Sequence, residues 1–324
     1  MTAMTVAQAA ALIRAGELVA FPTETVYGLG ADASNDLAVA KIFAVKGRPA
    51  DHPLIVHVAS ASQVSSYASS VPLFAQALMA AFWPGPLTVI LPRKPGVANA
   101  AAGGQNSIGL RCPAHPLALD FLAACKDLGV LGVAGPSANK FGRVSPTTAS
   151  HVAQEFGDAV QVLDGGPCAV GIESSIVDCT RSAPVLLRPG VLTRAQLEAA
   201  CGQIVLNADD TADAAPRAPG TLESHYAPNA KVRLMDAKAI QTALDLLGAD
   251  AAHIAIYARS IVRIPSLNVR YRRMPDDALA AASQLFAVLR DFDAQGVKLI
   301  WIEPLPLDAA WDGVRDRLMR AAAG

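Results

Sequence analysis

Residues 130–139 read VLGVAGPSAN, a short apolar run followed at once by small polar side chains. The apolar half, Val130 to Ala134, predicts a buried strand, and the half from Gly135 to Asn139 predicts a loop at the carboxyl end of that strand. Open α/β sheets bind their ligands outside the carboxyl ends of the strands. The stretch therefore indicates an α/β sheet and also the edge of that sheet at which a ligand would bind.

The alternation of strands and helices continues on both sides of this stretch. The first helix is marked by a capping box, Thr5 with Gln8. Further helices are predicted at 37–46, 71–82, 116–125 and from Ser145-Pro146 onward, with Ser145 as the N-cap. Strands are predicted at 18–21, 53–58, 87–91, 107–111, 160–163 and 175–178, and a polar turn at 22–30. Such alternation is typical of a layered α/β domain with helices flanking a sheet.

The composition of the sequence changes between Asn207 and Pro228, where an acidic, Pro-bearing segment predicts a linker or a functional loop. Beyond it, strands predicted at 232–235, 253–257, 269–274 and 298–302 alternate with helices at 237–247 and 276–292, and a last helix ends the chain. We therefore divide the chain into a first domain at 1–202, a linker or lid at 203–230 and a smaller α/β domain at 231–324.

The composition excludes several classes of protein. Hydrophobic residues make up 52% of the 324 residues and charged residues 17%, which allows a sizeable core and excludes wholesale disorder. The formal net charge of −1 excludes a strongly basic nucleic-acid coat. Five cysteines without a C-x-x-C pair predict buried thiols in a reducing cytosol. The sequence has neither an apolar run of about 18 residues nor a signal-peptide pattern, so we expect a cytoplasmic protein without a membrane span.

Two short motifs suggest chemistry that their surroundings do not support. Residues 28–33 match G-x-G-x-x-A, but the preceding strand is predicted to end near Phe21, so the strand–turn–helix context of a dinucleotide site is poor. Residues 137–140 match S-x-x-K, but the separate K-T-G element of a serine acyl-enzyme is missing. The sequence also lacks the P-loop, H-E-x-x-H and EF-hand patterns.

Cationic and hydroxyl side chains gather at the ends of the predicted elements. Lys46 and Arg48 lie at the end of a helix, where they could form a phosphate clamp or simply cap the helix. His57 and Arg111 end two strands, and they could be an ordinary core histidine and a surface arginine. A glycine-rich loop at 165–175 delivers hydroxyl groups onto the next strand. Together these groups indicate an α/β enzyme that binds a small polar molecule and a polyphosphate.

Segments along almost the whole chain resemble the YrdC-like threonylcarbamoyl-AMP synthase family. The segments are Phe21 to Leu29, Lys46 to Pro49 with Pro53 to His57, Gly135 to Asn139, Gly171 to Ser175, Leu187 to Gly190 and Ser224 to Pro228. The last two resemble the long form of the family, which adds a linker and a C-terminal domain. The resemblance implies an open twisted mixed sheet with flanking helices, followed by a smaller Rossmann-like α/β domain.

The resemblance also implies a reaction. A nucleotidyltransferase of this family forms L-threonylcarbamoyl-AMP and pyrophosphate from L-threonine, bicarbonate or CO2, and ATP. The product would feed N6-threonylcarbamoylation of adenosine 37 in tRNA, which a separate transferase complex carries out. Mg2+ would accompany ATP and share the phosphate charge, with no metal ligand expected from protein side chains.

Individual residues are assigned to the two substrates by the same resemblance. Charge at the phosphates is expected from Lys46 and Arg48 as catalytic residues. Contacts with ATP are expected at Arg48, His52, Ser107, Ser137, Asn139, Ser145, Arg188 and His225. Contacts with L-threonine are expected at Thr25, His57, Arg111, Gly135 and Ser174. The family usually carries Asn at the position of His52, and His225 is expected to belong to a lid that keeps water from the product.

Two rival functions stay open. A cluster in the second domain suggests a double-stranded RNA- or tRNA-binding module without synthase activity; it consists of Arg259, Arg263, Arg270, Arg272 and Arg273. A steep salt dependence of tRNA affinity would favour that function, and weak tRNA binding is also compatible with the synthase. A carbamoyltransferase for hydrogenase maturation would need an acylphosphatase-like segment and C-x-x-C zinc motifs, which the sequence lacks.

Overall fold

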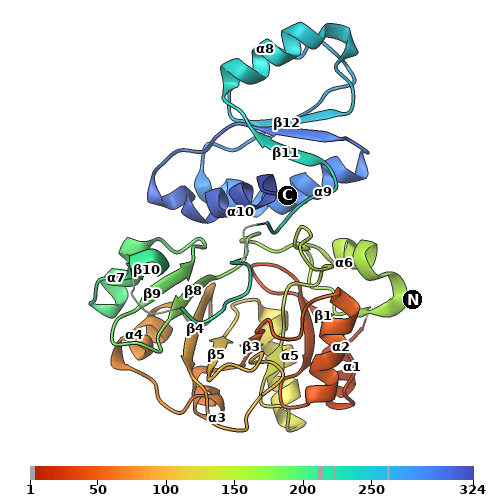
Figure 1. Ribbon diagram of the computed structural model, residues 1–324. Helices are drawn as coiled ribbons and strands as arrows, with labels where there is room; N and C mark the ends of the chain where they lie inside the picture. The colour runs from red at the N-terminus through yellow and green to blue at the C-terminus, as the bar shows by residue number, and fades with distance from the viewer. Residues whose placement is uncertain (1–3, 211–214, 222–223, 261–262) are drawn as a thin grey trace.

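The computed structural model describes residues 4–210, 215–221, 224–260 and 263–324, which form two α/β domains joined by a linker (Figure 1). The larger domain contains a ten-stranded mixed sheet in the order β10-β9-β8-β4-β5-β3-β6-β2-β1-β7. Its strands are β1 (Val19–Phe21), β2 (Gly28–Asp32), β3 (Ile55–His57), β4 (Leu87–Pro92), β5 (Ser107–Arg111), β6 (Val133–Ala134), β7 (Gln161–Val162), β8 (Ser175–Asp178), β9 (Val185–Arg188) and β10 (Leu206–Asn207).

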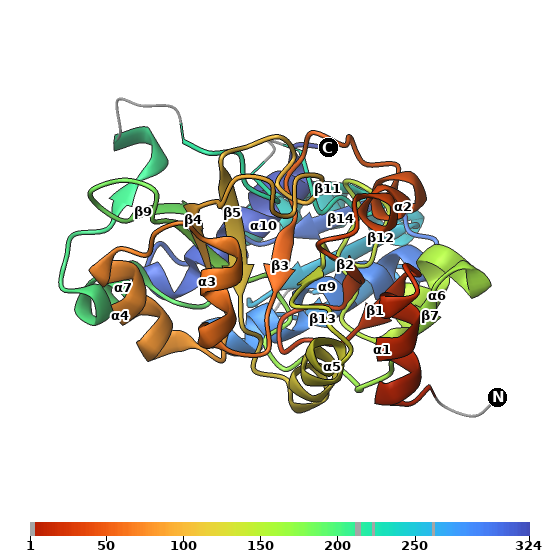
Figure 2. The ribbon, with the colours of Figure 1, turned by 90° about the horizontal axis from the view of Figure 1, so that it is seen from below.

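Helices cover both faces of the large sheet because its strands are apolar on both sides. The helices are α1 (Val6–Arg14), α2 (Asp36–Lys46), α3 (Val64–Tyr67), α4 (Leu73–Phe82), α5 (Pro116–Asp127), α6 (Ala149–Phe156) and α7 (Arg194–Cys201). Phe21 of β1 packs in a core with α1 and α5, whereas its neighbour Ala20 packs in a second core with α2. Figure 2 shows α1 and α5 on one side and α2 on the other. This is the mixed α/β architecture that the sequence predicts.

The C-terminal domain is a four-stranded parallel sheet with helices on both faces. Its strands, in the order β11-β14-β12-β13, are β11 (Lys231–Leu234), β14 (Leu299–Ile302), β12 (Ile254–Ala258) and β13 (Arg270–Arg273). Its helices are α8 (Ala237–Leu247), α9 (Ala278–Ala294) and α10 (Asp312–Ala322). Helix α8 packs on one face of the sheet, and α9 and α10 pack on the other. Helices α9 and α10 therefore lie between this sheet and the larger domain (Figure 1).

Two sequence predictions about local structure are wrong. Residues 28–30, predicted as part of a polar turn, begin strand β2, which pairs antiparallel with β1. A Cβ atom at Gly30 would lie 2.9 Å from Cγ1 of Val133 and 3.0 Å from the carbonyl oxygen of Val19, so this strand needs small residues that resemble a turn sequence.

The second wrong prediction is the N-cap of α6, which is Thr148 and not Ser145. The backbone N–H of Tyr27 donates to the carbonyl of Pro146 over 2.9 Å, so the chain from Ser145 runs alongside Tyr27 before the helix begins. Strand β9, which the sequence analysis did not predict, pairs antiparallel with β8 and carries Arg188 at its end. The end of α2 follows the prediction: Gly47 caps it with φ of 64°, and Lys46 is its last residue.

No helix in the described part of the chain is long and apolar enough to cross a membrane. The five cysteines are free thiols, and all except Cys201 are buried.

Candidate functional site

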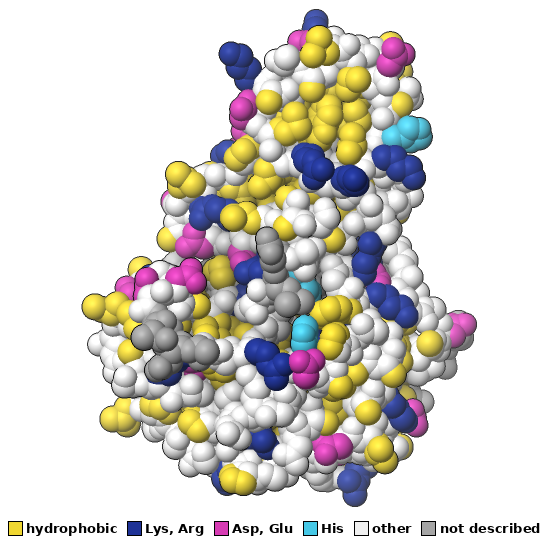
Figure 3. Space-filling view, viewed as in Figure 1, with side chains coloured by type: hydrophobic (Ala, Val, Ile, Leu, Met, Phe, Trp, Pro, Cys, Tyr) yellow, Lys and Arg dark blue, Asp and Glu magenta, His cyan; other side chains and the backbone are white. Residues whose placement is uncertain are grey.

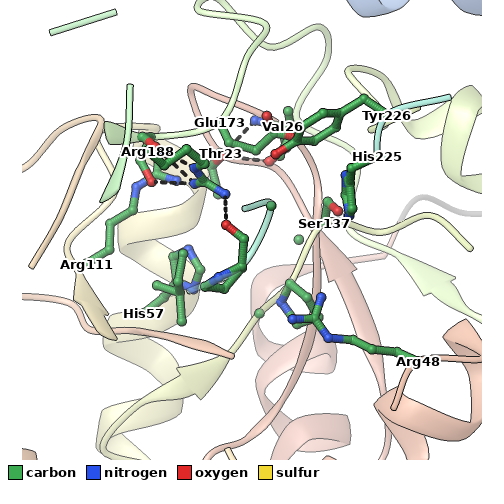
Figure 4. A pocket seen from close by; sticks show the side chains of 17 residues that line it. Thr23, Val26, Arg48, His57, Arg111, Ser137, Glu173, Arg188, His225 and Tyr226 are labelled. Carbon is green, nitrogen blue, oxygen red and sulfur yellow. Dashed lines mark hydrogen bonds between the residues drawn. The ribbon is translucent and has the colours of Figure 1, made fainter. Parts of the chain in front are cut away.

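A cavity lies where the ends of several strands of the large sheet meet the linker (Figure 4). It encloses about 50 Å³. The walls come from the segment after β1, the end of α2, strands β3 and β5, the loop after β6, the loop before β8, the end of β9 and the linker. The cavity therefore lies at the edge of the sheet that residues 130–139 indicated.

Three buried guanidinium groups line the cavity, those of Arg48, Arg111 and Arg188. Figure 4 shows Arg111 and Arg188 on one side and Arg48 on the other. Arg48 donates to the carbonyl of Pro53 over 2.9 Å. Arg188 donates to the carbonyl of Ser174 through Nε and Nη2 over 3.1 and 2.9 Å. Backbone carbonyls thus hold two of the three cations without neutralising them.

The charges of these arginines are only partly compensated. Arg111 forms an ion pair of 2.7 Å with Glu24, but within the described residues neither Arg48 nor Arg188 is ion-paired with a carboxylate. Burial lowers the pKa of Arg48 to about 10 and also lowers the pKa of Arg188, because a low-dielectric environment disfavours the charged form. Both groups remain protonated near neutral pH. The charge that remains uncompensated on them favours an anion in the cavity.

A neutral histidine lies beside these cations. Burial, and then the charge of Arg111, lower the pKa of His57 to about 3, and its Nδ1 has no hydrogen-bond partner. The ring meets Phe21 edge-on, with centroids 5.5 Å apart. A Cβ atom at Gly135 would lie 3.0 Å from His57 Nδ1, so a glycine at this position leaves that nitrogen room. His57 therefore presents an uncharged, unpaired nitrogen next to the cavity.

Hydroxyl groups complete the lining. Ser174 Oγ lies 2.8 Å from Thr88 Oγ1 and 3.3 Å from Nη2 of Arg188. Ser137 and Thr23 also line the cavity. The cavity thus combines fixed positive charge with short hydroxyl side chains, and both kinds of group hydrogen-bond to phosphates and carboxylates.

Both domains match known families. Residues 11–190 match the family described as "Telomere recombination", and residues 192–323 match "Threonylcarbamoyl-AMP synthase, C-terminal domain". A threonylcarbamoyl-AMP synthase of Bacillus subtilis is 40% identical over 98% of this chain and 93% of the relative. The chain belongs to the threonylcarbamoyl-AMP synthase family.

Other members of this family resemble the chain over its whole length. The threonylcarbamoyl-AMP synthase of Pyrococcus abyssi is 38% identical over 97% of this chain and 93% of the relative. A crystal structure of P. abyssi Sua5 complexed with L-threonine superposes with a TM-score of 0.87 at 37% identity, covering 98% of this chain and 94% of that one. The synthase family thus accounts for both domains and the linker.

Most of the residues that the family resemblance assigned to substrates meet at one place. The cavity is lined by Arg48, His57, Arg111, Gly135, Ser137, Ser174, Arg188 and His225. His52 lines an adjoining hollow of about 70 Å³, which shares Arg48 and His225 with the cavity. Ser107 lines a smaller hollow that shares Ile55 and Pro219 with it. The adjoining hollows extend the candidate synthase site along the linker.

Four assigned residues line neither the cavity nor the adjoining hollows, and two of them support a wall of the cavity. Lys46 is buried, and its Nζ donates to the carbonyls of Ser137 and Asn139, both over 2.5 Å. Burial, and then the nearby Arg48, lower the pKa of Lys46. Asn139 donates to carbonyls of its own loop, those of Lys140 and Arg143. Lys46 and Asn139 therefore hold the loop that carries Ser137.

The remaining two assigned residues lie one layer behind the cavity. Ser145 is fully buried and donates a hydrogen bond to the carboxylate of Glu173. Thr25 Oγ1 lies 2.9 Å from the hydroxyl of Thr23, which does line the cavity. The Thr23 hydroxyl is also 2.6 Å from the carbonyl of Val26. Thr25 thus does not line the cavity itself but contacts Thr23, which does.

Sequence reasoning missed several functional side chains. Glu24 holds Arg111, and it also accepts from the backbone N–H of Ala114 over 3.0 Å. Thr23, Glu173 and Tyr226 line the cavity although no role was assigned to them. A signal was present for the two glutamates, because each lies inside a segment that carries the family resemblance, and a carboxylate that becomes buried is retained when it is paired.

Described residues of the linker contact the cavity. Nη1 of Arg188 donates to the carbonyl of Pro219 over 2.8 Å, and Arg217 pairs with Asp51 over 2.6 Å. Further along, His225 is buried against Phe141 and Tyr226, and burial lowers its pKa to about 3. Described residues of the linker thus line the candidate synthase site, and the lid stays a prediction.

Proposed function

We propose that the chain forms L-threonylcarbamoyl-AMP and pyrophosphate from L-threonine, bicarbonate or CO2, and ATP. The observation that carries this proposal is the buried pair Arg48 and Arg188, which reach one cavity from different elements without a carboxylate partner in the described residues. Membership of the threonylcarbamoyl-AMP synthase family supports the substrates. The product would pass to a separate transferase that modifies tRNA.

The chemistry needs positioning and charge neutralisation more than a covalent nucleophile. The amine of threonine adds to CO2 and loses a proton, which gives a carbamate. A carbamate oxygen then attacks the α-phosphorus of ATP, and the bond to pyrophosphate breaks. We assign Arg48 and Arg188 to the phosphate oxygens, on which negative charge accumulates. Both guanidinium groups are already held by backbone carbonyls, so little reorganisation is needed.

The threonine side of the site is assigned to Arg111, His57 and Ser174. Arg111 is oriented by Glu24 and can bind a carboxylate through its remaining N–H groups. His57 is neutral, so its ring can exchange hydrogen bonds without adding a fourth positive charge. The Ser174 hydroxyl lies between Thr88 and Arg188 and offers a further polar contact.

Mg2+ belongs to the proposal as an ion that arrives with ATP. Within the described residues, no group of three or more His, Cys, Asp or Glu side chains is arranged to hold a metal ion. Mg2+ is commonly bound through substrate phosphates and water with few protein ligands, so the cavity is compatible with it. When bound, the ion would share the negative charge of the triphosphate.

Substrate entry requires the linker to move. The cavity encloses about 50 Å³, whereas pockets for ligands of nucleotide size span roughly 300–1,000 Å³. We propose that the described linker residues 217–221 and 224–226 swing out to admit ATP and return to exclude water from the mixed anhydride. His225 and Tyr226 would then cover the nucleotide.

The test is mass spectrometry of the products formed from ATP, bicarbonate and L-threonine. We expect L-threonylcarbamoyl-AMP and pyrophosphate in equal amounts, with no product when threonine is omitted. L-Serine serves as the control, and because it lacks one methyl group we expect discrimination of about 1–3 kcal/mol. Pyrophosphate release that does not depend on the amino acid would contradict the proposal.

A further inference from the structure

A single arginine of the C-terminal domain is inserted into the first domain. Arg317 of α10 has no exposed surface and is the largest fully buried side chain among the described residues. Its Nε donates to the Glu173 carboxylate over 2.9 Å, and its Nη2 donates to the Glu173 carbonyl over 3.1 Å. Its Nη1 donates to the carbonyl of Pro189 over 2.6 Å. One guanidinium therefore holds two separate segments of the first domain.

These two segments carry side chains of the cavity. Glu173 itself lines the cavity and precedes Ser174, and Pro189 follows Arg188. The Arg317 guanidinium also lies over the ring of Tyr226, 5.4 Å from its centroid, so it contacts the linker as well. Three walls of the cavity, from three different parts of the chain, thus converge on Arg317.

The partner of Arg317 is kept charged. Burial alone would raise the pKa of Glu173, but Arg317, Arg188 and the Ser145 hydroxyl outweigh burial, so the pKa lies below its usual value. The carboxylate has both oxygens occupied, one by Arg317 and the other by Ser145. Losing Arg317 would leave this buried carboxylate incompletely paired, and the surrounding loop would have to rearrange to solvate it.

We infer that Arg317, which the C-terminal domain supplies, is a positioning residue of the active site. It fixes the positions of Ser174, Arg188 and Tyr226 around the substrates. The inference rests on the proposed function and gives the C-terminal domain a role in the active site. Arg317 does not line the cavity, so it acts through Glu173 and Pro189 and not by touching substrate.

A second interdomain arginine separates positioning from simple anchoring. Arg290 of α9 forms an ion pair of 2.9 Å with Glu155 and donates to the carbonyl of Val144. Like Arg317, it is a largely buried arginine that joins the C-terminal domain to a glutamate of the first domain. Its partners Glu155 and Val144 do not line the cavity. Its Nε also donates over 3.4 Å to the carbonyl of Ser145, whose hydroxyl donates to Glu173. Arg290 therefore shares the anchoring role of Arg317, but it approaches a cavity wall only through this long hydrogen bond to a backbone carbonyl and not through its carboxylate partner.

The backbones of the two domains are in contact near Arg317, and this contact fixes the distance between Arg317 and the first domain. A Cβ atom at Gly313, one turn before Arg317, would lie 2.3 Å from the carbonyl oxygen of Gly190. A Cβ atom at Gly171 would lie 2.5 Å from Cα of Ser283 in α9. Side chains at these glycines would push the domains apart. The close approach places α10 at a fixed distance from the loops that Arg317 holds.

The experiment compares Arg317→Met with Arg290→Met and Arg315→Met in the full chain, below the lowest melting temperature of the set. Arg315 lies on the same helix but pairs with Asp312 inside the C-terminal domain. We expect kcat/KM for threonine-dependent pyrophosphate release to fall about 100-fold in Arg317→Met, as displaced substrate-positioning groups would cause. In both controls we expect kcat/KM within about threefold of wild type. Equal losses in Arg317→Met and Arg290→Met, or no loss in Arg317→Met, would overturn the inference.

A milder pair keeps the test decisive if Arg317→Met does not fold. Arg317→Lys keeps the charge but cannot span Glu173 and Pro189 together, whereas Arg290→Lys makes the same change at the control site. We expect kcat/KM to fall about tenfold in Arg317→Lys and to stay near wild type in Arg290→Lys. Equal values in the two lysine variants would contradict the positioning role.

Binding of ATP, measured by calorimetry on the same variants, distinguishes the two levels of the proposal. Wild-type protein that binds ATP but releases no threonine-dependent pyrophosphate would refute the proposed function. In that case weaker ATP binding by Arg317→Met than by Arg290→Met would still support the positioning role, and equal binding would refute it. Active wild-type protein with indistinguishable variants would refute the inference alone.

Discussion

Arginines occur in two contrasting settings in this molecule. Those of the cavity, such as Arg48 and Arg188, are at least nine-tenths buried and donate to backbone carbonyls. Those of β13 in the C-terminal domain are exposed, and Arg272 and Arg273 pair with Asp291 and Asp276 over 3.1 and 3.0 Å. Carbonyls orient a cation and leave its charge available, whereas surface carboxylates neutralise it in high-dielectric solvent.

The difference shows that a cluster of arginines in the sequence does not by itself make an anion site. Figure 3 shows Lys and Arg side chains on both domains, with Asp and Glu side chains beside several of them. Burial without a carboxylate partner is what distinguishes the cavity. Substitutions in the two settings test this contrast.

Arg48→Ala is expected to cause the largest change. The residue lines both the cavity and the adjoining hollow that contains His52, so its loss would remove a preorganised donor that we propose for the phosphates. We expect kcat to fall about 100- to 1,000-fold. The measurement is steady-state pyrophosphate release, with thermal unfolding as the check that the fold persists. Turnover near that of the wild type would show that buried, carbonyl-held arginines are not the phosphate site.

Lys46→Met is expected to lower the stability of the fold as its primary effect, and to affect catalysis only secondarily. The variant leaves the carbonyls of Ser137 and Asn139 buried without their donor. We expect the free energy of unfolding to fall by about 2–4 kcal/mol. Urea denaturation measures this, and Lys140→Met is the matched control, because Lys140 is exposed and its Nζ donates to the carbonyl of Val45 over 3.2 Å. A stable Lys46→Met protein with abolished ATP binding would instead place the ammonium among the phosphate contacts.

The buried histidines predict how stability depends on pH. Burial lowers the pKa of both His57 and His225 to about 3, so the unfolded chain binds protons below pH of about 6.5 that the folded chain does not. The free energy of unfolding therefore has its full contribution from these histidines above a pH of about 6.5. It falls as the pH is lowered toward about 3, by up to about 1.4 kcal/mol per pH unit for each group.

Replacing His57 with Gln removes one of these titrating groups. We expect the loss of unfolding free energy between about pH 6.5 and pH 5 to be smaller in His57→Gln than in the wild type. Urea denaturation at several pH values makes the comparison. Parallel curves for the two proteins would mean that His57 is protonated in the folded state, and that the cavity holds a further positive charge.

The exposed arginines are expected to give the smallest effect. Arg272→Ser and Arg273→Ser remove surface ion pairs whose arginine side chains are more than half exposed. We expect changes in unfolding free energy within about 0.5 kcal/mol and unchanged kcat/KM. The affinity for tRNA, measured over a range of salt concentrations, tests the rival RNA-binding function. A steep salt dependence in the wild type that both variants reduce would show that β13 binds RNA.

Much of the local structure could be predicted because its signals are short-range. The capping box of Thr5 and Gln8 and the end of α2 at Gly47 depend on neighbouring residues only, and both occur as predicted. His57 and Arg111 could be placed at strand ends from apolar runs alone, and the two strands pair in register, so the two side chains arrive side by side. The N-cap of α6 was misplaced because Pro146 bonds to Tyr27, more than a hundred residues earlier in the chain.

The amino-acid sequence by itself determined the α/β class, the sheet edge that carries the site and the positions of His57 and Arg111 at strand ends, because apolar periodicity and strand ends are local properties of a chain. Arg188 and His225 were assigned to the site through the family resemblance and not through periodicity. Only the tertiary structure decided that Lys46 turns into the loop behind the cavity, and that Arg317 reaches Glu173 across 144 positions of sequence. The direction of a long cationic side chain depends on which carbonyls and carboxylates surround it after folding, and these groups come from distant segments.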